Sequence, residues 1–446
     1  MSELPEKPSK DRTAVELFAG AGGLAMAVRN AGFRPLLVNE FAKHACATLR
    51  ANQILPRERG DVVPAAGDSR LLVEGDVQRL DMRYLKGAVD VLAGGPPCQP
   101  FSLGGVAKGE EDKRNMFPEM FRAVREIEPK AVICENVKGL LRPSFKPYFD
   151  YILRELELPF EEREDTNWEV HDKQLRERIR RADVDPHQRY NIVLSSVNAA
   201  DYGVPQVRNR IIVVAFRADL DVDLDAFRAA VEPTHSEDAL IRSILNGEYW
   251  EKFEEMPPDH VRERVEGLYK GKEPADDGKL PWRTLRDAIY GKHDERGVLR
   301  DPLPPVPWDR LDRMDFDPGF RYHAGWPGAR FYHGHTPNYL DRPAKTVKAG
   351  VHGVPGGESV MLTDDLDSGR FSSSDGSLDE TLKKWPYKHR YMTVRETARV
   401  MTFPDQWHLE GPRGEKMRQL GNAVPVLLGE VFAKAVAAVL DEAEKR

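Results

Sequence analysis

The side chains best suited to chemistry in this sequence are one thiol, one carboxylate and a pair of guanidinium groups. The thiol, Cys98, ends the stretch Gly94-Gly95-Pro96-Pro97-Cys98, in which glycines and prolines stop a strand and stiffen its exit. A lone cysteine is more often buried and inert than reactive. A core cysteine needs no such rigid frame, however, so Cys98 is predicted to be a nucleophile.

The carboxylate is Glu135, which follows the apolar residues 131–134 and is itself followed by Asn136. A carboxylate at the end of a buried strand, beside a nucleophile, is a candidate general acid or base. The guanidinium groups belong to Arg208 and Arg210, which share one face if their segment is extended. Such a pair suits a base oxygen, a carboxylate or a phosphate, whereas isolated arginines are more often surface ion pairs.

These side chains need a scaffold, and the first half of the chain predicts one. Short apolar runs alternate with amphipathic helical stretches there, which indicates an α/β domain whose parallel strands meet ligands at their carboxyl ends. The predicted strands are residues 13–18, 35–39, 71–77, 89–93, 131–134, 191–196 and 211–216. The predicted helices are 24–30, 42–52, 116–126, 391–403 with a capping box at Thr393 and Glu396, and 426–443.

A glycine-rich turn links the first strand to the first helix through Gly20, Gly22 and Gly23. Glycines at such a turn let the backbone approach a bound nucleotide closely. A dehydrogenase would use the spacing Gly-x-Gly-x-x-Gly, with an acid about 20 residues on. On these residues alone, a dehydrogenase and a methyltransferase are equally compatible with the turn.

Three further side chains could hold a nucleoside. Glu40 ends the second strand and could accept both ribose hydroxyls, and Asp76 ends the third and could accept from an adenine amino group. Phe41 could stack on adenine or be a core aromatic, and Asp76 could instead cap a turn.

Composition limits the remaining possibilities. The chain has 446 residues, 31% of them charged, a mean hydropathy of -0.55 and a net charge of -7. These values predict a soluble protein of two domains, or of one large domain with an insertion, without a membrane span or secretory signal. Three cysteines favour a reducing compartment over a disulfide scaffold, although a Cys98–Cys134 bridge is an alternative. The acidic total disfavours nucleic acid only weakly, because a local basic face can still bind it.

The second half of the chain has weaker patterns. Basic and aromatic residues alternate over residues 319–353, which fits a nucleic-acid surface or, alternatively, the core of a loop-rich β domain. Three histidines in this half (His323, His333, His335) lack a ligand partner at metal spacing, so no metal site is predicted. Residues 161–189 form a charged insert and residues 359–379 an acidic surface loop.

Taken in order, these motifs resemble those of the DNA (cytosine-5-)-methyltransferases, in particular the bacterial restriction-modification type. Each motif alone is modest, but their shared order is specific and excludes the dehydrogenase alternative. The resemblance rests on the stretch from Glu16 to Gly23, on Glu40 and Asp76, on Pro96-Pro97-Cys98, on Glu135-Asn136-Val137, on Gln206-Val207-Arg208-Asn209-Arg210, on Arg342-Pro343-Ala344-Lys345-Thr346, and on Gly421-Asn422-Ala423-Val424-Pro425. Residues 218–341 match nothing in the family, and the insert is longer than the family usually carries.

The resemblance implies a Rossmann-like sheet that binds S-adenosylmethionine, with a smaller, loop-rich, β-containing target recognition domain. The expected boundaries are 1–217 for the catalytic domain, 218–400 for the recognition domain (variable part 218–341), and 401–446 for a segment that returns to the catalytic domain. The resemblance implies catalytic roles for Cys98, Glu135, Asn136, Arg208 and Arg210. The cofactor residues would be Phe18, Gly20, Gly22, Gly23, Glu40, Phe41, Asp76, Val77, Pro96, Asn422 and Val424.

The implied reaction is methylation of cytosine carbon 5 in a specific sequence of double-stranded DNA, through base flipping and a covalent Cys98 adduct. The chain would act as a cytoplasmic, nucleoid-associated monomer, with a restriction endonuclease as functional partner. Two alternatives stay open at this point: a tRNA cytosine-5 methyltransferase on the same scaffold, and a non-catalytic DNA-binding regulator.

Overall fold

The computed structural model describes residues 11–57, 62–97, 115–163, 167–181, 183–306, 320–326, 329, 336–349, 359–366 and 387–446. Cys98 and the segment that follows it, up to residue 114, lie outside the described residues. So do residues 319, 327–328, 330–335 and 350–353 of the basic and aromatic stretch.

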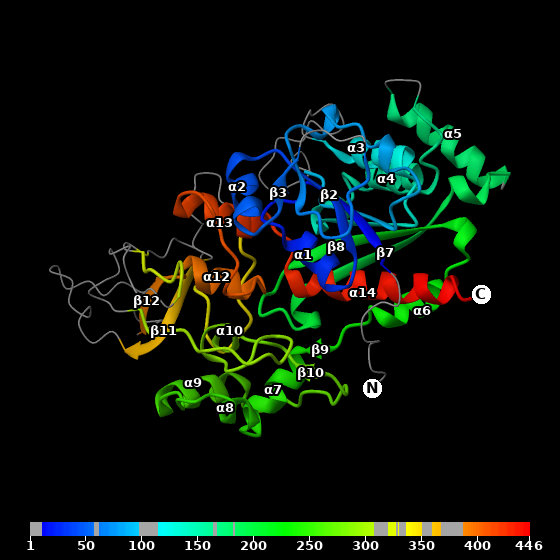
Figure 1. The fold of residues 1–446 in the computed structure, drawn as a ribbon. Helices are drawn as coiled ribbons and strands as arrows, with labels where there is room; N and C mark the ends of the chain where they lie inside the picture. Colours follow the sequence, from blue (N-terminus) through cyan, green and yellow to red (C-terminus); the bar gives the residue numbers. More distant parts are fainter. Residues whose placement is uncertain are drawn as a thin grey trace.

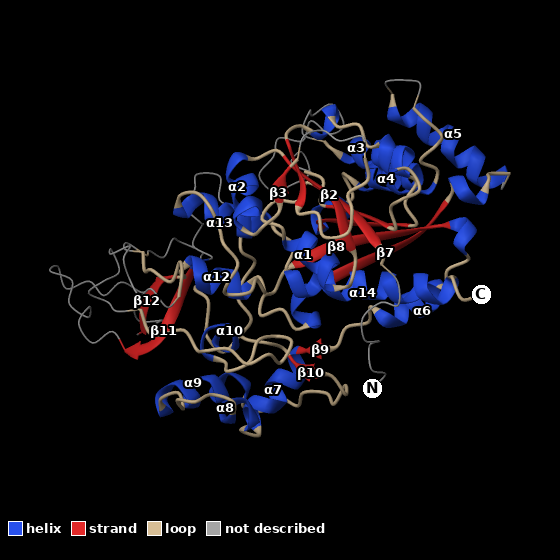
Figure 2. Ribbon diagram, in the orientation of Figure 1, coloured by secondary structure: helices blue, strands red, loops and turns tan. Residues whose placement is uncertain are grey.

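A mixed sheet forms the centre of the molecule, in the order β3-β4-β2-β1-β5-β6-β8-β7 (Figures 1 and 2). The strands from β3 to β6 are parallel, whereas β8 runs antiparallel to both β6 and β7. Their bounds are β1 Thr13–Leu17, β2 Arg34–Glu40, β3 Leu55–Pro56, β4 Arg70–Glu74, β5 Val91–Gly94, β6 Ala131–Val137, β7 Tyr190–Asn198 and β8 Asn209–Arg217. The predicted α/β sheet is therefore confirmed.

Helices cover both faces of this sheet because its strands are apolar on both sides. One face packs against α1 (Gly23–Asn30), α6 (Leu224–Ala230) and α14 (Val426–Ala443), the red helix beneath the sheet in Figure 1. The other face packs against α3 (Phe117–Ile127) and α4 (Lys146–Glu157). The α2 helix (Lys43–Ala51) covers the edge formed by β2 and β4.

The terminal helix differs in one respect from the sequence prediction. The helical stretch Arg413–Ala443 is long and apolar enough to cross a membrane, although no such run was expected. However, 78% of its most apolar window is buried inside the protein. We therefore assign α14 as the core helix of the sheet.

A second region, defined here as the described residues from 235 to 400, lies beside the sheet and is more helical than predicted. Its two sheets are small, β9 (His235–Ser236) with β10 (Leu280–Pro281) and β11 (Val360–Leu366) with β12 (Tyr387–Tyr391). Its helices are α7 Glu237–Leu245, α8 Glu248–Glu251, α9 Asp259–Tyr269, α10 Leu285–Tyr290 and α12 Val394–Val400.

Two predictions about this part of the chain have clear outcomes. Residues 359–366 are not a surface loop, since Val360, Met361 and Leu362 are buried in β11 by pairing with β12. The predicted capping box is confirmed: Thr393 and Glu396 each accept from the other's backbone N–H at the start of α12. After α12, α13 (Arg413–Asn422) leads into α14.

Candidate active site

Glu135 and Arg210 meet where β6 and β8 lie side by side. Their strands pair so that Val137 faces Arg210, and the Arg210 Nε lies 2.7 Å from the Glu135 Oε1. Each side chain is only 11% exposed. Gly95 lies directly beside this carboxylate, since a Cβ on Gly95 would be 3.6 Å from Glu135 Oε2, an ordinary van der Waals contact. The structure thus brings together two of the predicted catalytic side chains, at the end of β5 where the Cys98 stretch departs.

Asn136 holds the start of that stretch in place. Its Nδ2 donates to the carbonyl of Pro96 at 3.0 Å, while its own Oδ1 accepts from the backbone N–H of Val137 at 2.8 Å. Of the two partner residues, Pro96 is buried and Val137 is half-buried. Asn136 therefore fixes the proline turn two residues before Cys98, next to the carboxylate of Glu135.

Arg208 binds backbone carbonyls, whereas Arg210 binds the Glu135 carboxylate. Its guanidinium donates to three backbone carbonyls, those of Val347 at 2.9 Å, Gly421 at 2.8 Å and Ala423 at 2.9 Å. The side chain is 1% exposed, and burial holds its pKa well below the ordinary arginine value. The sequence placed the two arginines on one face, but they do not bind one common acceptor. Arg208 instead holds the chain that leads into α14.

The stretch 342–346 runs beside the Arg208 segment, as expected of a motif that orders the second region. Gln206 pairs with Ala344 as a parallel bridge, and the Gln206 Oε1 accepts from the backbone N–H of Val347 at 3.0 Å. The Thr346 hydroxyl donates to the carbonyl of Val207 at 2.8 Å. These bonds join the second region to the sheet directly beside the candidate catalytic pair.

The glycine turn and Glu40 form a single hydrogen-bonded unit. The backbone N–H of Gly20 donates to Glu40 Oε2 at 2.6 Å, and the Phe41 and Ala42 N–H groups donate to Oε1 at 2.8 and 2.7 Å. Positive φ angles at Phe18, Gly20 and Gly22 curl the turn around this carboxylate. Glu40 thereby connects the turn after β1 to the start of α2.

The remaining nucleoside candidates line the neighbouring strand ends. Phe41 is 76% exposed, so the alternative of a core aromatic is excluded. Asp76 follows β4 and caps a short 3₁₀ helix at Val77 by accepting from the N–H of Gln78 at 3.0 Å. That capping role leaves the second oxygen of Asp76 open to a ligand.

The C-terminal segment closes on the glycine turn. A Cβ on Gly23 would lie 2.3 Å from the carbonyl oxygen of Val424, so only glycine permits this approach. Asn422 is exposed at the end of α13, and Val424 is buried. The C-terminal segment and the glycine turn therefore meet in a direct backbone contact.

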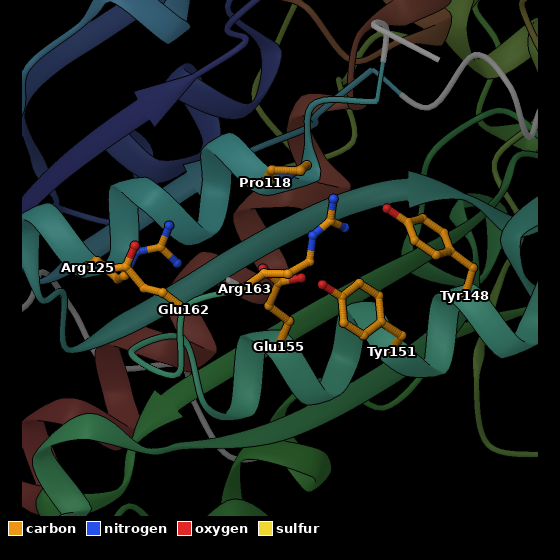
Figure 3. Close-up of a pocket in the computed structure, with 7 residues that line it drawn as sticks. All are labelled: Pro118, Arg125, Tyr148, Tyr151, Glu155, Glu162 and Arg163. Carbon is orange, nitrogen blue, oxygen red and sulfur yellow. The ribbon is translucent and has the colours of Figure 1, made fainter. Parts of the chain in front are cut away.

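A separate pocket lies between α3, α4 and the start of the insert (Figure 3). Its lining residues are Pro118, Arg125, Tyr148, Tyr151, Glu155, Glu162 and Arg163. Burial raises the pKa of Glu155 and of Tyr151, and Tyr151 Oη lies 3.1 Å from Nδ1 of His171 on α5 (Trp168–Arg181). None of the predicted site residues lines this pocket, so it is not the candidate active site.

Comparison with known proteins identifies the family that has this arrangement. The family model described as C-5 cytosine-specific DNA methylase matches residues 13–159 and 183–438. The chain belongs to this family. The gap in the match, 160–182, overlaps the expected insert 161–189 and contains the whole of α5.

This C-5 cytosine-specific DNA methylase has relatives that match nearly its whole length. It is 30% identical to the type II methyltransferase M.PspPI of Psychrobacter sp. (strain TA137), over 99% of this chain and 83% of that protein. It is 31% identical to M.Eco47II of Escherichia coli, over 97% and 81% of the two chains. The enzyme is accordingly a DNA (cytosine-5-)-methyltransferase, and the tRNA alternative is not favoured.

Solved structures agree on the fold. A protein assigned as a DNA modification methyltransferase, encoded within an E. coli prophage, superposes with a TM-score of 0.52 at 20% identity, over 96% of this chain and 99% of that chain. Spodoptera frugiperda DNMT2 gives 0.50 at 15% identity, over 96% and 99%. The Rossmann-like architecture predicted for the sheet is thus shared with these proteins.

Proposed function

We propose that the enzyme uses Cys98, Glu135 and Arg210 to methylate carbon 5 of a cytosine flipped out of a specific double-stranded DNA sequence. The observation that carries this proposal is the Asn136 bond to Pro96, beside the Glu135–Arg210 pair. This bond holds Pro96, two residues before Cys98, next to the carboxylate and the guanidinium, which supports the proposal. A thiol, an acceptor and a donor around one space can bind and activate a pyrimidine ring.

In this scheme the Cys98 thiolate adds to carbon 6 of the cytosine, which turns the ring into an enamine whose carbon 5 is nucleophilic. Glu135 binds the ring nitrogen and amino edge and stabilises the charge that develops there. Arg210 holds both Glu135 and the base oxygen, because a guanidinium can serve two acceptors. After methylation, loss of the carbon 5 proton and release of Cys98 restore the aromatic ring.

The cofactor residues fit S-adenosylmethionine, which supplies an electrophilic methyl group when bound. Glu40 and Asp76 supply acceptors for the ribose and adenine, and exposed Phe41 offers a stacking face. Glu16, 4% exposed, has no hydrogen bond of normal geometry to either carboxyl oxygen among the described residues. A cationic group at the methionine end of the cofactor would compensate this buried acid.

The wider context follows from the relatives. Because the two relatives quoted above are type II methyltransferases, we infer that this enzyme protects DNA from a paired restriction endonuclease. We further infer that it works as a monomer in the cytoplasm, with the variable part 218–341 as its sequence reader.

Covalent trapping tests the proposal. DNA that carries 5-fluorocytosine at the target should become covalently bound, since the fluorine cannot leave as a proton does. Cys98→Ser should abolish trapping while S-adenosylmethionine still binds. The matched control is Cys46→Ala, which removes a buried thiol whose pKa is raised to about 12 and should trap normally. Trapping by Cys98→Ser, or methylation of tRNA in preference to DNA, would refute the proposal.

A further inference from the structure

Trp407 touches the cofactor turn from the opposite end of the chain. It lies after α12, and its indole N–H donates to the carbonyl of Ala21 at 3.1 Å. A Cβ on Gly22, where φ is +83°, would come within 3.0 Å of the indole ring. Trp407 is 7% exposed and packs beside Phe403, with ring centroids 6.2 Å apart. The indole therefore covers the turn and satisfies one of its carbonyls.

The residues that follow Trp407 brace the other half of the cofactor site. The His408 N–H donates to Asn52 Oδ1 at 3.0 Å, and the Asn52 amide donates back to the His408 carbonyl at 2.9 Å. The Glu410 N–H donates to the Thr48 hydroxyl at 2.8 Å. Thr48 and Asn52 lie on and just after α2, the helix that begins beside Glu40 and Phe41.

The segment 407–410 is itself held rigidly from α12. Arg395, fully buried, donates to the carbonyls of Pro404 at 3.3 Å and Trp407 at 3.4 Å. Arg399, also on α12, donates to the carbonyls of Ala288 and Ile289 in the second region, at 3.4 and 3.3 Å. One short segment thus connects the second region to both the glycine turn and α2.

From these contacts we infer that Trp407 is a positioning residue for S-adenosylmethionine. Its indole N–H fixes the Ala21 peptide, and hence the direction of the N–H groups at the start of α1, which the anionic end of the cofactor would meet. The segment 407–410 holds this turn in a fixed position relative to Glu40 and Phe41. The inference rests on the cofactor assignment proposed above and gives a role to a residue that touches no substrate.

Calorimetric titration of the full chain with S-adenosylmethionine tests this inference. Trp407→Phe keeps a six-membered aromatic ring but removes the five-membered ring of the indole with its N–H donor, so the Kd should rise about fivefold, the usual worth of one net hydrogen bond. Trp407→Ala also uncovers Gly22 and should weaken binding further. The matched control is Trp282→Phe, which removes an indole bond 2.9 Å long from the second region to Asp201, just after β7, and should leave the Kd unchanged.

Kinetics separate positioning from a merely structural role. Trp407→Phe should raise the KM for S-adenosylmethionine while kcat and the KM for DNA stay at the parent's values. If Trp407→Phe does not fold, Thr48→Val removes the neighbouring bond to Glu410 and should raise the same KM. A Kd for Trp407→Phe equal to that of Trp282→Phe would overturn the inference. Failure of the parent chain to bind S-adenosylmethionine would instead overturn the cofactor assignment itself.

Discussion

The strands of the sheet region bury almost continuous runs of apolar side chains, whereas the interior of the second region contains arginines and carboxylates. Both faces of the sheet pack against apolar helix faces, in two large clusters. In the second region Arg286 is 3% exposed and bonds to both Asp341 and Asp364. Arg390 pairs with Glu396 in the same buried manner. The sheet region also buries a charged cluster around Arg12, but at its rim, where the N-terminal strand meets the end of α14.

This difference suits the two tasks that we propose for the regions, methyl transfer in the sheet region and DNA reading in the second region. Methyl transfer needs a rigid frame around Glu135, Arg210 and the Cys98 stretch, and close apolar packing provides rigidity without regard to pH. A region that reads DNA must present polar and basic groups, and buried pairs hold its loops in defined positions. Such pairs add little net stability, but breaking one leaves an uncompensated buried charge.

The largest effect should come from breaking that buried charge cluster. Arg286→Ala leaves Asp341 and Asp364 without their partner, which should cost about 3–5 kcal/mol of unfolding free energy. Urea unfolding should show an early transition assigned to the second region by limited proteolysis. The exposed pair Arg83–Asp81 supplies the control, since Arg83→Ala should unfold like the parent. Unfolding of Arg286→Ala at the parent's urea midpoint would show that the cluster is not what holds this region.

The matching change in the sheet region is Leu92→Ala. Leu92 is fully buried in the central strand β5, so its truncation should cost about 2–5 kcal/mol through lost packing and a cavity. Because no charge is involved, the loss should be the same at pH 5 and pH 7.5 in urea unfolding. A loss that varied strongly between the two pH values would contradict the assigned difference between the regions.

Acid should act in opposite directions on the most deeply buried acids of the two regions. Arg390 holds the pKa of Glu396 at about 2 against the cost of burial, and Lys252 likewise lowers the pKa of Asp287. Their contribution is full above the unfolded value, about 4.3 for glutamate, and is lost as the pH falls toward 2. In the sheet region burial raises the pKa of Glu16 and of Glu155, so protonation of these two acids favours the folded state. Asp81, Glu128 and Asp219 of this region have lowered pKa values and act the other way, but they are more exposed.

Pepsin digestion between pH 5 and pH 2.5 would reveal this order. Cleavage should begin between residues 235 and 400 while the sheet remains intact. Burial also raises the pKa of Glu295, which opposes the trend within the second region but is outnumbered by the depressed groups. First cuts within the strands of the sheet would contradict the predicted order.

The smallest effect concerns the junction between the regions. Thr393→Ala removes the capping box of α12 and should cost about 1 kcal/mol in thermal or urea unfolding. Thr393→Ser retains the capping oxygen and should behave like the parent. Equal stability of the alanine and serine variants would show that the capping box does not stabilise α12.

The sequence predicted the sheet and the candidate site because both depend on local patterns. Apolar runs located the central strands, and the terminal helix 426–443 begins and ends as expected. The second region was harder to predict from the sequence. The helices α7 and α9 bury only one part of an otherwise polar surface, and the strand Val360–Leu366 pairs with a strand that is distant in the sequence. The contacts of Trp407 and the carbonyl partners of Arg208 were not predicted. They join residues that are 386 and 139–215 positions apart in the sequence, and such contacts leave no local sequence pattern.

The central claim is that the sheet region performs the methylation while the variable part of the second region chooses the sequence. The most direct measurement replaces residues 218–341 with the corresponding segment of M.Eco47II and maps methylated cytosines in host DNA by bisulfite sequencing. The account predicts that the chimera methylates the target of that relative, with the parent's affinity for S-adenosylmethionine. A folded, active chimera that still methylates the parent's sequence would contradict it.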